Sequence, residues 1–142
     1  MKIGIACDHA GFEFKEKTKE YFLSKNIKIK DFGCYSKESV DYPDFSHKLS
    51  KSIEKKECDF GIQFCGTGNG INMTANKHKE IRSALCWNPY IAEQSRLHNN
   101  ANVLTMPARH LTWKEVKKII DVFFETKFEG GRHEKRVKKI KI

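Results

Sequence analysis

Five short apolar runs, each followed by a segment of helical character, constrain the fold of this chain more than any other feature. After the first run, for example, Phe14, Tyr21 and Phe22 recur at near-helical spacing among Lys and Glu residues. The five runs predict strands at residues 3–7, 27–32, 60–64, 83–86 and 103–106. The segments after the last four predict helices that begin near Pro43 and near Asn69 and that span 89–97 and 112–124. Five strand–helix units indicate an α/β fold, with a parallel sheet covered by helices on both faces.

The starts of several helices are marked by residues that favour a first helical turn. Pro43 and Pro89 stand where a first turn tolerates proline, and Thr112 with Glu115 has the Thr-x-x-Glu spacing of a capping box. The closing segment, 130–142, predicts a turn followed by a short basic helix. That segment has little apolar surface of its own, so we expect it to dock elsewhere.

Length and composition predict one soluble domain, 1–142. No stretch approaches the roughly 20 apolar residues of a membrane helix, and a strand that begins at residue 2 leaves no room for a signal peptide. We therefore expect a cytoplasmic protein without a membrane partner. The five cysteines are an odd number and have no zinc-ligand spacing, so reduced thiols and no metal are expected.

The strongest local signal is the segment FCGTGNGINMTANK at 64–77, where an apolar strand runs through a glycine-rich turn into a helix. Three alternating glycines expose backbone N–H groups, and such a turn binds an anion or an oxyanion. Tight turns without ligands also have this composition. The segment matches neither a dinucleotide fingerprint, because Ile71 replaces the third glycine, nor a P-loop, because Gly-Lys-Ser/Thr is missing. Cys65 at the end of the strand is a candidate base, in a setting that predicts a lowered thiol pKa.

Further polar residues lie at the ends of predicted elements. Asp8 and His9 follow the first strand, where they would hold sugar hydroxyls or a phosphate, although Asp8 could equally cap the next helix. His98, with Asn99, ends a helix just before the fifth strand, in a place where a histidine can act as acid or base.

The C-terminal segment EGGRHEKRV carries Arg132 and Arg136, and Arg109 lies after the fifth strand. On a helix, Arg132 and Arg136 face the same way and could grip a phosphate. A solvated basic tail is the alternative. The net charge of +9 fits a lysine-rich exterior better than nucleic-acid binding, since the basic residues lack interleaved aromatics.

Five motifs together resemble the ribose-5-phosphate isomerase type B family, which also includes galactose-6-phosphate isomerase subunits and allose-6-phosphate isomerases. They cover nearly the whole chain in order and are CDHAG at 7–11, DYPDF at 41–45, CGTGNGINMTANK at 65–77, RLHNNANVL at 96–104 and EGGRHEKRV at 129–137. The resemblance implies a Rossmann-like three-layer α/β/α fold with a five-stranded parallel sheet and a C-terminal basic helix. It also implies a homodimer or tetramer with active sites between subunits and no metal or organic cofactor.

The resemblance also implies roles for individual residues. Cys65 would be the proton acceptor, His98 the donor that opens the sugar ring, and Thr67 an aid in stabilising negative charge on the substrate. The loop that holds the enediolate oxygens would comprise Gly66, Gly68, Asn69 and Gly70. The residues that bind the substrate would be Asp8, His9, Asn99, Arg109, Arg132 and Arg136.

The expected activity is the interconversion of D-ribose 5-phosphate and D-ribulose 5-phosphate in the pentose phosphate pathway. Two alternatives stay open at this point. One is an isomerase of hexose 6-phosphates, galactose or allose 6-phosphate, since motifs do not report the length of the pocket. The other is a nucleotide- or nucleic-acid-binding module that uses the glycine-rich loop and the basic tail.

Overall fold

A computed structural model describes all residues, 1–142. It contains one sheet of five parallel strands in the order β2-β1-β3-β5-β4. The strands are β1 (Ile3–Cys7), β2 (Lys30–Asp31), β3 (Phe60–Cys65), β4 (Ser83–Leu85) and β5 (Val103–Pro107). The predicted parallel sheet of five strands is therefore confirmed.

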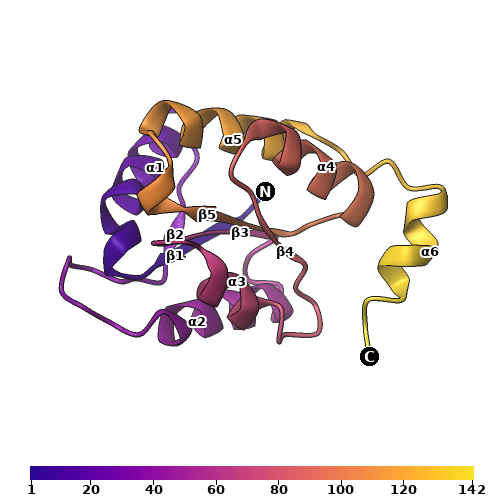
Figure 1. Cartoon of the computed structure of the whole chain (residues 1–142), viewed down its shortest axis with the longest axis horizontal. Helices are drawn as coiled ribbons and strands as arrows, with labels where there is room; N and C mark the ends of the chain where they lie inside the picture. The colour runs from indigo at the N-terminus through magenta and orange to yellow at the C-terminus, as the bar shows by residue number, and fades with distance from the viewer.

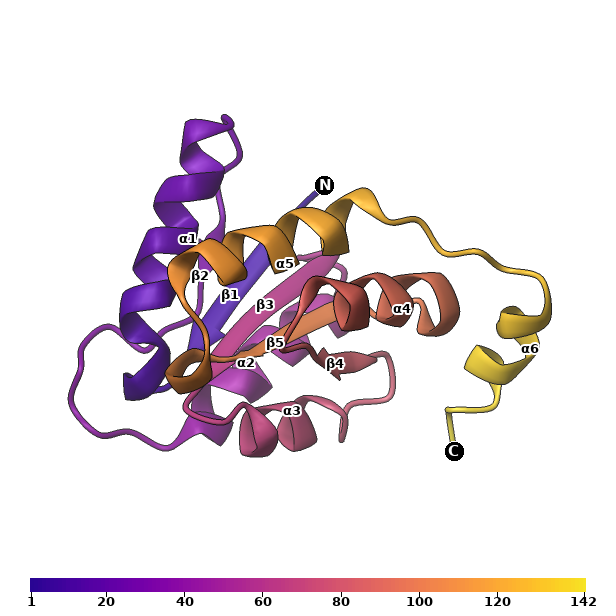
Figure 2. The same ribbon diagram turned by 45° about the horizontal axis from the view of Figure 1, so that its top comes forward.

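Helices cover both faces of the sheet, which gives three layers (Figure 1). On one face lie α1 (Phe12–Ser24), α4 (Pro89–Asn99) and α5 (Trp113–Glu125). On the other face lie α2 (Tyr42–Glu54) and α3 (Asn69–Ala75). The short basic helix α6 (Arg132–Lys138) packs against α4 and stands beside the sheet, as Figure 2 also shows. This arrangement confirms the predicted Rossmann-like three-layer fold with a C-terminal basic helix.

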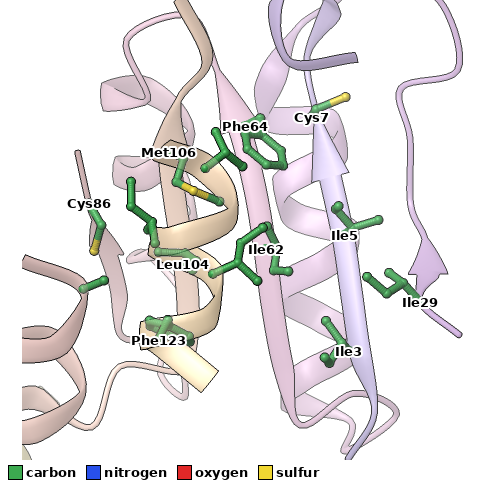
Figure 3. Close-up of a cluster of buried hydrophobic side chains, with 14 of the residues drawn as sticks. Ile3, Ile5, Cys7, Ile29, Ile62, Phe64, Cys86, Leu104, Met106 and Phe123 are labelled. Carbon is green, nitrogen blue, oxygen red and sulfur yellow. The ribbon is translucent and has the colours of Figure 1, made fainter. Parts of the chain in front are cut away.

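The core lies between the sheet and its helices because alternate strand residues point to the same face. Ile5 on β1 pairs with Ile62 on β3, which in turn pairs with Leu104 on β5. Figure 3 shows these side chains in one cluster with Phe123, which α5 contributes. All five residues of β1 are buried, as expected of a strand covered on both faces.

Most predicted boundaries hold within two residues, and the second strand is the exception. The predicted strand at 27–32 is wrong in extent, since β2 has only two residues, Lys30 and Asp31. It pairs with β1 alone, at Gly4 and Ile5, because it is the edge strand of the sheet. Edge strands are commonly short, since a long unpaired edge invites aggregation.

The predicted helix starts are confirmed in the structure. Pro43 and Pro89 stand in the first turns of α2 and α4. Thr112 and Glu115 form the capping box of α5, each accepting a hydrogen bond from the backbone N–H of the other. The five cysteines are free thiols, as predicted. None of the helices combines the length and the apolar character needed to span a membrane.

Candidate active site

Asp8 and Cys65 lie side by side at the carboxyl edge of the sheet. The strands β1 and β3 are neighbours, and their register pairs Cys7 with Phe64. The residues that follow, Asp8 and Cys65, therefore lie opposite each other. The thiol Sγ of Cys65 donates a hydrogen bond to Oδ2 of Asp8 at 2.9 Å. The strand order also reverses between β1 and β3, which is where open parallel sheets bind ligands.

The second carboxylate oxygen of Asp8 caps a short 3-10 helix, η1 (His9–Gly11). Oδ1 accepts hydrogen bonds from the backbone N–H groups of Ala10 at 3.0 Å and Gly11 at 3.2 Å. The capping role predicted as an alternative is thus confirmed. Asp8 is 5 % exposed, so its carboxylate is held in one orientation, with Oδ2 directed at the sulfur of Cys65.

The predicted lowering of the Cys65 pKa is wrong for the chain by itself. Burial, together with the hydrogen bond and the negative charge of Asp8, raises the pKa of the thiol to about 11. The backbone amides of Gly66 and Gly68 lower this pKa, but by less. At neutral pH Cys65 is therefore a protonated thiol in the isolated chain, hydrogen-bonded to the carboxylate of Asp8.

The first glycine of the loop lies against Arg109, which belongs to the 3-10 helix η2 (Ala108–His110). The backbone N–H of Arg109 donates to the carbonyl oxygen of Gly66 at 3.1 Å. A Cβ atom on Gly66 would lie 3.0 Å from Nη1 of Arg109, so a larger residue would displace the guanidinium. The structure thus brings Arg109 to Cys65 and the loop, as the sequence predicted.

The other two loop glycines are required by close contacts. Gly68 has a φ of +79°, in the left-handed region, and directly precedes α3. At Gly70, a Cβ atom would lie 2.5 Å from the hydroxyl oxygen of Tyr42. Within the same turn, Oγ1 of Thr67 accepts a hydrogen bond from the backbone N–H of Asn69 at 3.4 Å.

Tyr42 was assigned no role from the motifs. It is the first residue of α2 and is 36 % exposed beside the glycine loop. Its place inside the motif DYPDF is the signal that would have found it. His9 accepts a hydrogen bond at Nδ1 from the backbone N–H of Val40 at 3.2 Å, so its Nε2 is left for another partner.

We call the residues described so far the carboxyl-edge group. They lie at or directly after the carboxyl ends of β1, β3 and β5 and comprise Asp8, His9, Cys65, the loop at 66–70 and Arg109.

The remaining predicted residues form a second cluster, which we call the amino-edge group. His98 and Asn99 end α4, which runs back across the sheet, so they lie near the start of β5 rather than at its end. Arg132 and Arg136 lie on α6, both exposed, and α6 packs on α4. The amino-edge group comprises His98, Asn99, Arg132, His133 and Arg136.

The histidine next to Arg132 was missed by the sequence interpretation. The ring of His133 stacks on that of His98, with ring centres 4.3 Å apart and planes at 15°. Nε2 of His133 also lies 3.4 Å from Oε2 of Glu129. Burial and the neighbouring His98 lower the pKa of His133, which favours its neutral form. Its position within the motif EGGRHEKRV was the available signal.

His98, Glu129 and His133 are the one set of side chains with a spacing that suits a metal ion, since their ligand atoms lie within 4.8 Å of one another. The orientation of the rings does not suit one. Because the two imidazoles stack, the lone pairs of their Nε2 atoms lie in nearly parallel planes and do not meet at one ion.

Within one chain, the carboxyl-edge and amino-edge groups lie at opposite edges of the sheet. The strands are parallel, so the end of β3 and the start of β5 lie at opposite edges of the sheet. Figure 1 shows α6 far from the carboxyl ends of the strands. A single chain therefore does not bring Cys65 together with His98 or the arginines of α6.

Comparison with known proteins identifies the family of this chain. The sequence profile described as Ribose/Galactose Isomerase matches residues 3–140. The chain belongs to this ribose/galactose isomerase family. The resemblance predicted from the five motifs is thereby confirmed, and the family assignment favours an isomerase over a nucleic-acid-binding module.

Members of the ribose/galactose isomerase family with solved structures have the same fold. The crystal structure of a ribose 5-phosphate isomerase from Thermotoga maritima is similar, with a TM-score of 0.97 and 51% identity over 99% of this chain and 97% of that one. Ribose-5-phosphate isomerase B from Mycoplasma genitalium, solved with bound ribulose-5-phosphate, has a TM-score of 0.93 and 40% identity over 98% of this chain and 93% of that one. Ribose-5-phosphate isomerase B from Escherichia coli is 38% identical over 98% of this chain and 93% of its own length.

Proposed function

We propose that this chain interconverts D-ribose 5-phosphate and D-ribulose 5-phosphate, as an aldose–ketose isomerase of the cytoplasmic pentose phosphate pathway. The observation that carries the proposal is the contact of Cys65 with Asp8 beside the glycine loop, in a member of a sugar isomerase family. The relative that binds ribulose-5-phosphate supports the choice of substrate.

The active site is completed by a second copy of the chain, in a homodimer or a tetramer. The carboxyl-edge group of one copy holds the candidate base, but the cations of α6 lie at the other edge of the same copy. Bringing the amino-edge group of a second copy to Cys65 joins all predicted residues in one cleft. A closed dimer with two-fold symmetry forms two such sites.

Phosphate binding falls to the cations of both copies. Arg109 and His9 lie in the carboxyl-edge group, and Arg132 and Arg136 come from the second copy with Asn99. Arginine pairs with phosphate in a bidentate manner, so these side chains fix the reacting carbons in place. Their positive charge also favours the thiolate form of Cys65 when the site is assembled, against the effect of burial.

The reaction is a proton transfer between neighbouring carbons. His98 of the second copy assists opening of the furanose ring, and Cys65 as thiolate then removes the proton from C2. The thiol first passes its own proton on, and the carboxylate of Asp8 is the acceptor already in contact with it. The resulting cis-enediolate is stabilised by the N–H groups of Gly66, Gly68, Asn69 and Gly70 with Thr67. The hydroxyl proton moves from O2 to O1, and Cys65 returns its proton to C1, which gives the ketose.

A coupled isomerase assay tests the proposal. The purified chain is offered ribose 5-phosphate, allose 6-phosphate and galactose 6-phosphate at equal concentrations. The proposal predicts the highest kcat/KM for ribose 5-phosphate. A preference for either hexose phosphate would refute the substrate but keep the reaction class, and no turnover of any of the three would refute the function.

A further inference from the structure

The side chain of Arg96 on α4 is a buried cation without a carboxylate partner. Arg96 is 9 % exposed, and its guanidinium carbon lies 5.2 Å from the ring centre of Phe60 and 5.5 Å from that of Phe123. A buried charge is costly unless other groups offset it. The burial of this charge therefore indicates a specific role for Arg96, to which the motif RLHNNANVL assigned none.

Three hydrogen bonds of Arg96 reach the ends of two helices. Nε donates to the carbonyl oxygen of Thr126 at 3.2 Å, and Nη1 donates to Oδ1 of Asn100 at 3.0 Å and to the carbonyl oxygen of Ala101 at 2.6 Å. Thr126 caps α5 and Asn100 caps α4. The carboxyl end of a helix carries partial negative charge, so two helix ends and two aromatic faces take the place of a counterion.

These bonds tie α4 to the segment that leads to α6. Thr126 begins the connector 126–131, and the backbone N–H of Glu129 in that connector donates to the carbonyl oxygen of Leu97 at 3.1 Å. His133 on α6 then stacks on His98, two residues along α4 from Arg96. Arg96 and His133 are the buried members of this series of contacts, which together place α6 relative to the end of α4.

We propose that Arg96 is a positioning residue, which sets the place of the arginines of α6 relative to His98 so that the amino-edge group meets the substrate as one unit. The inference rests on the proposed function. Arg96 acts through its neighbours, since it is buried and its bonds go to helix ends rather than outward. Lysine is a poor substitute because an ammonium lacks the planar fork that spans two helix ends.

The test compares Arg96→Met and Arg96→Lys with a matched control, Arg82→Met. Nε of Arg82 donates to the carbonyl oxygen of Asn100 at 2.9 Å, so Arg82 contacts the cap of α4 but makes no hydrogen bond to the connector. Three quantities are measured on the full chain: amide hydrogen exchange at Glu129 and along α6, kcat and KM for ribose 5-phosphate, and the alkylation rate of Cys65.

For Arg96→Met we expect exchange at Glu129 and α6 to be roughly tenfold faster, because the connector opens locally. We expect KM to rise roughly tenfold with a smaller change in kcat, since misplaced arginines weaken phosphate binding. Exchange in β1 and β3 stays as in the wild type, and alkylation of Cys65 slows, because the displaced arginines no longer favour its thiolate form. Arg96→Lys recovers part of the loss, and Arg82→Met leaves KM and the exchange at Glu129 unchanged.

Unchanged exchange at Glu129 and unchanged KM in Arg96→Met would overturn the inference. Faster exchange throughout the sheet would also overturn it, because Arg96 would then support general stability only. A wild-type chain that turns over no phosphosugar would refute the proposed function and the catalytic meaning of Arg96 with it. The exchange comparison would still show in that case whether Arg96 holds the connector.

Discussion

The two halves of the proposed site are held by the fold in different ways. The carboxyl-edge group follows directly from paired central strands, so Asp8 and Cys65 are buried and fixed by hydrogen bonds. The amino-edge group lies on the ends of α4 and on α6, with Arg132 and Arg136 exposed. In the proposed site, the paired strands hold the candidate base in one place, and the exposed helix surface carries the arginines proposed to bind the phosphate.

The largest effect is expected at Cys65, where one atom would carry the proton transfer. Cys65→Ala should lower kcat by about 10³-fold or more, because the base is lost, while ribose 5-phosphate still binds to the cations. Exchange of the C2 proton with solvent, followed by NMR in deuterated water, measures the loss. Cys58→Ala, at a buried thiol before β3, is the matched control and should keep full exchange. Undiminished exchange in Cys65→Ala would remove the sulfur from the mechanism.

A smaller effect is expected at His98, the residue of the amino-edge group that we propose to assist opening of the sugar ring. His98→Asn should slow turnover of ribose 5-phosphate about 10²-fold, because ring opening loses its proton donor. A substrate analogue that cannot cyclise should be affected much less. The control His47→Asn changes a histidine on α2, outside both groups. Equal slowing of the cyclic and open-chain compounds would contradict the assignment.

Arg136 tests whether the exposed cations bind rather than catalyse. Arg136→Ala should raise KM for ribose 5-phosphate roughly tenfold and change kcat less, since one charged contact with the phosphate is lost. Lys135→Ala, at the adjacent position of α6, should leave KM unchanged. The idea of a phosphate grip fails if the two variants have the same KM.

The smallest expected effect concerns the pKa of Cys65 within the carboxyl-edge group. Asp8 raises this pKa, so Asp8→Asn should lower it from about 11 and increase the thiolate fraction at pH 8. Iodoacetamide alkylation at pH 8 should accelerate by about tenfold for each unit by which the pKa falls. The pH at which alkylation reaches half its maximal rate reports the pKa directly. An unchanged or higher midpoint in Asp8→Asn would show that burial alone sets the pKa.

The fold and half of the site were predictable because strand ends are visible in the sequence. Apolar runs locate the strands, and polar residues directly after a run lie at the carboxyl edge, which placed Asp8, Cys65 and Arg109 correctly. The same rule applied to His98, which precedes a strand, assigns it to the opposite edge. The position of each residue before or after a strand therefore predicts the edge of the sheet at which it lies.

Other features depend on which strands are neighbours, and apolar runs do not report this. The pKa of Cys65 is raised because β1 lies beside β3, an order that makes Asp8 the hydrogen-bond partner of the thiol. A glycine-rich turn suggested the opposite shift because only local donors were considered. The stacking of His133 on His98 was also missed, because a local interpretation does not show which helices, far apart in the chain, pack together.

The completion of one site by two copies is tested most directly by mixing two variants that each have little activity when ribose 5-phosphate is kept well below the wild-type KM. Cys65→Ala lacks the carboxyl-edge base, and a double variant, Arg132→Ala with Arg136→Ala, lacks the amino-edge cations. After unfolding and refolding together in equal amounts, half of the dimers are mixed, and each mixed dimer has one intact site. Activity should therefore recover to about one quarter of the wild-type value. If the mixture stays as inactive as either variant refolded alone while mixed dimers are present, each site belongs to a single chain and the division between two copies is wrong.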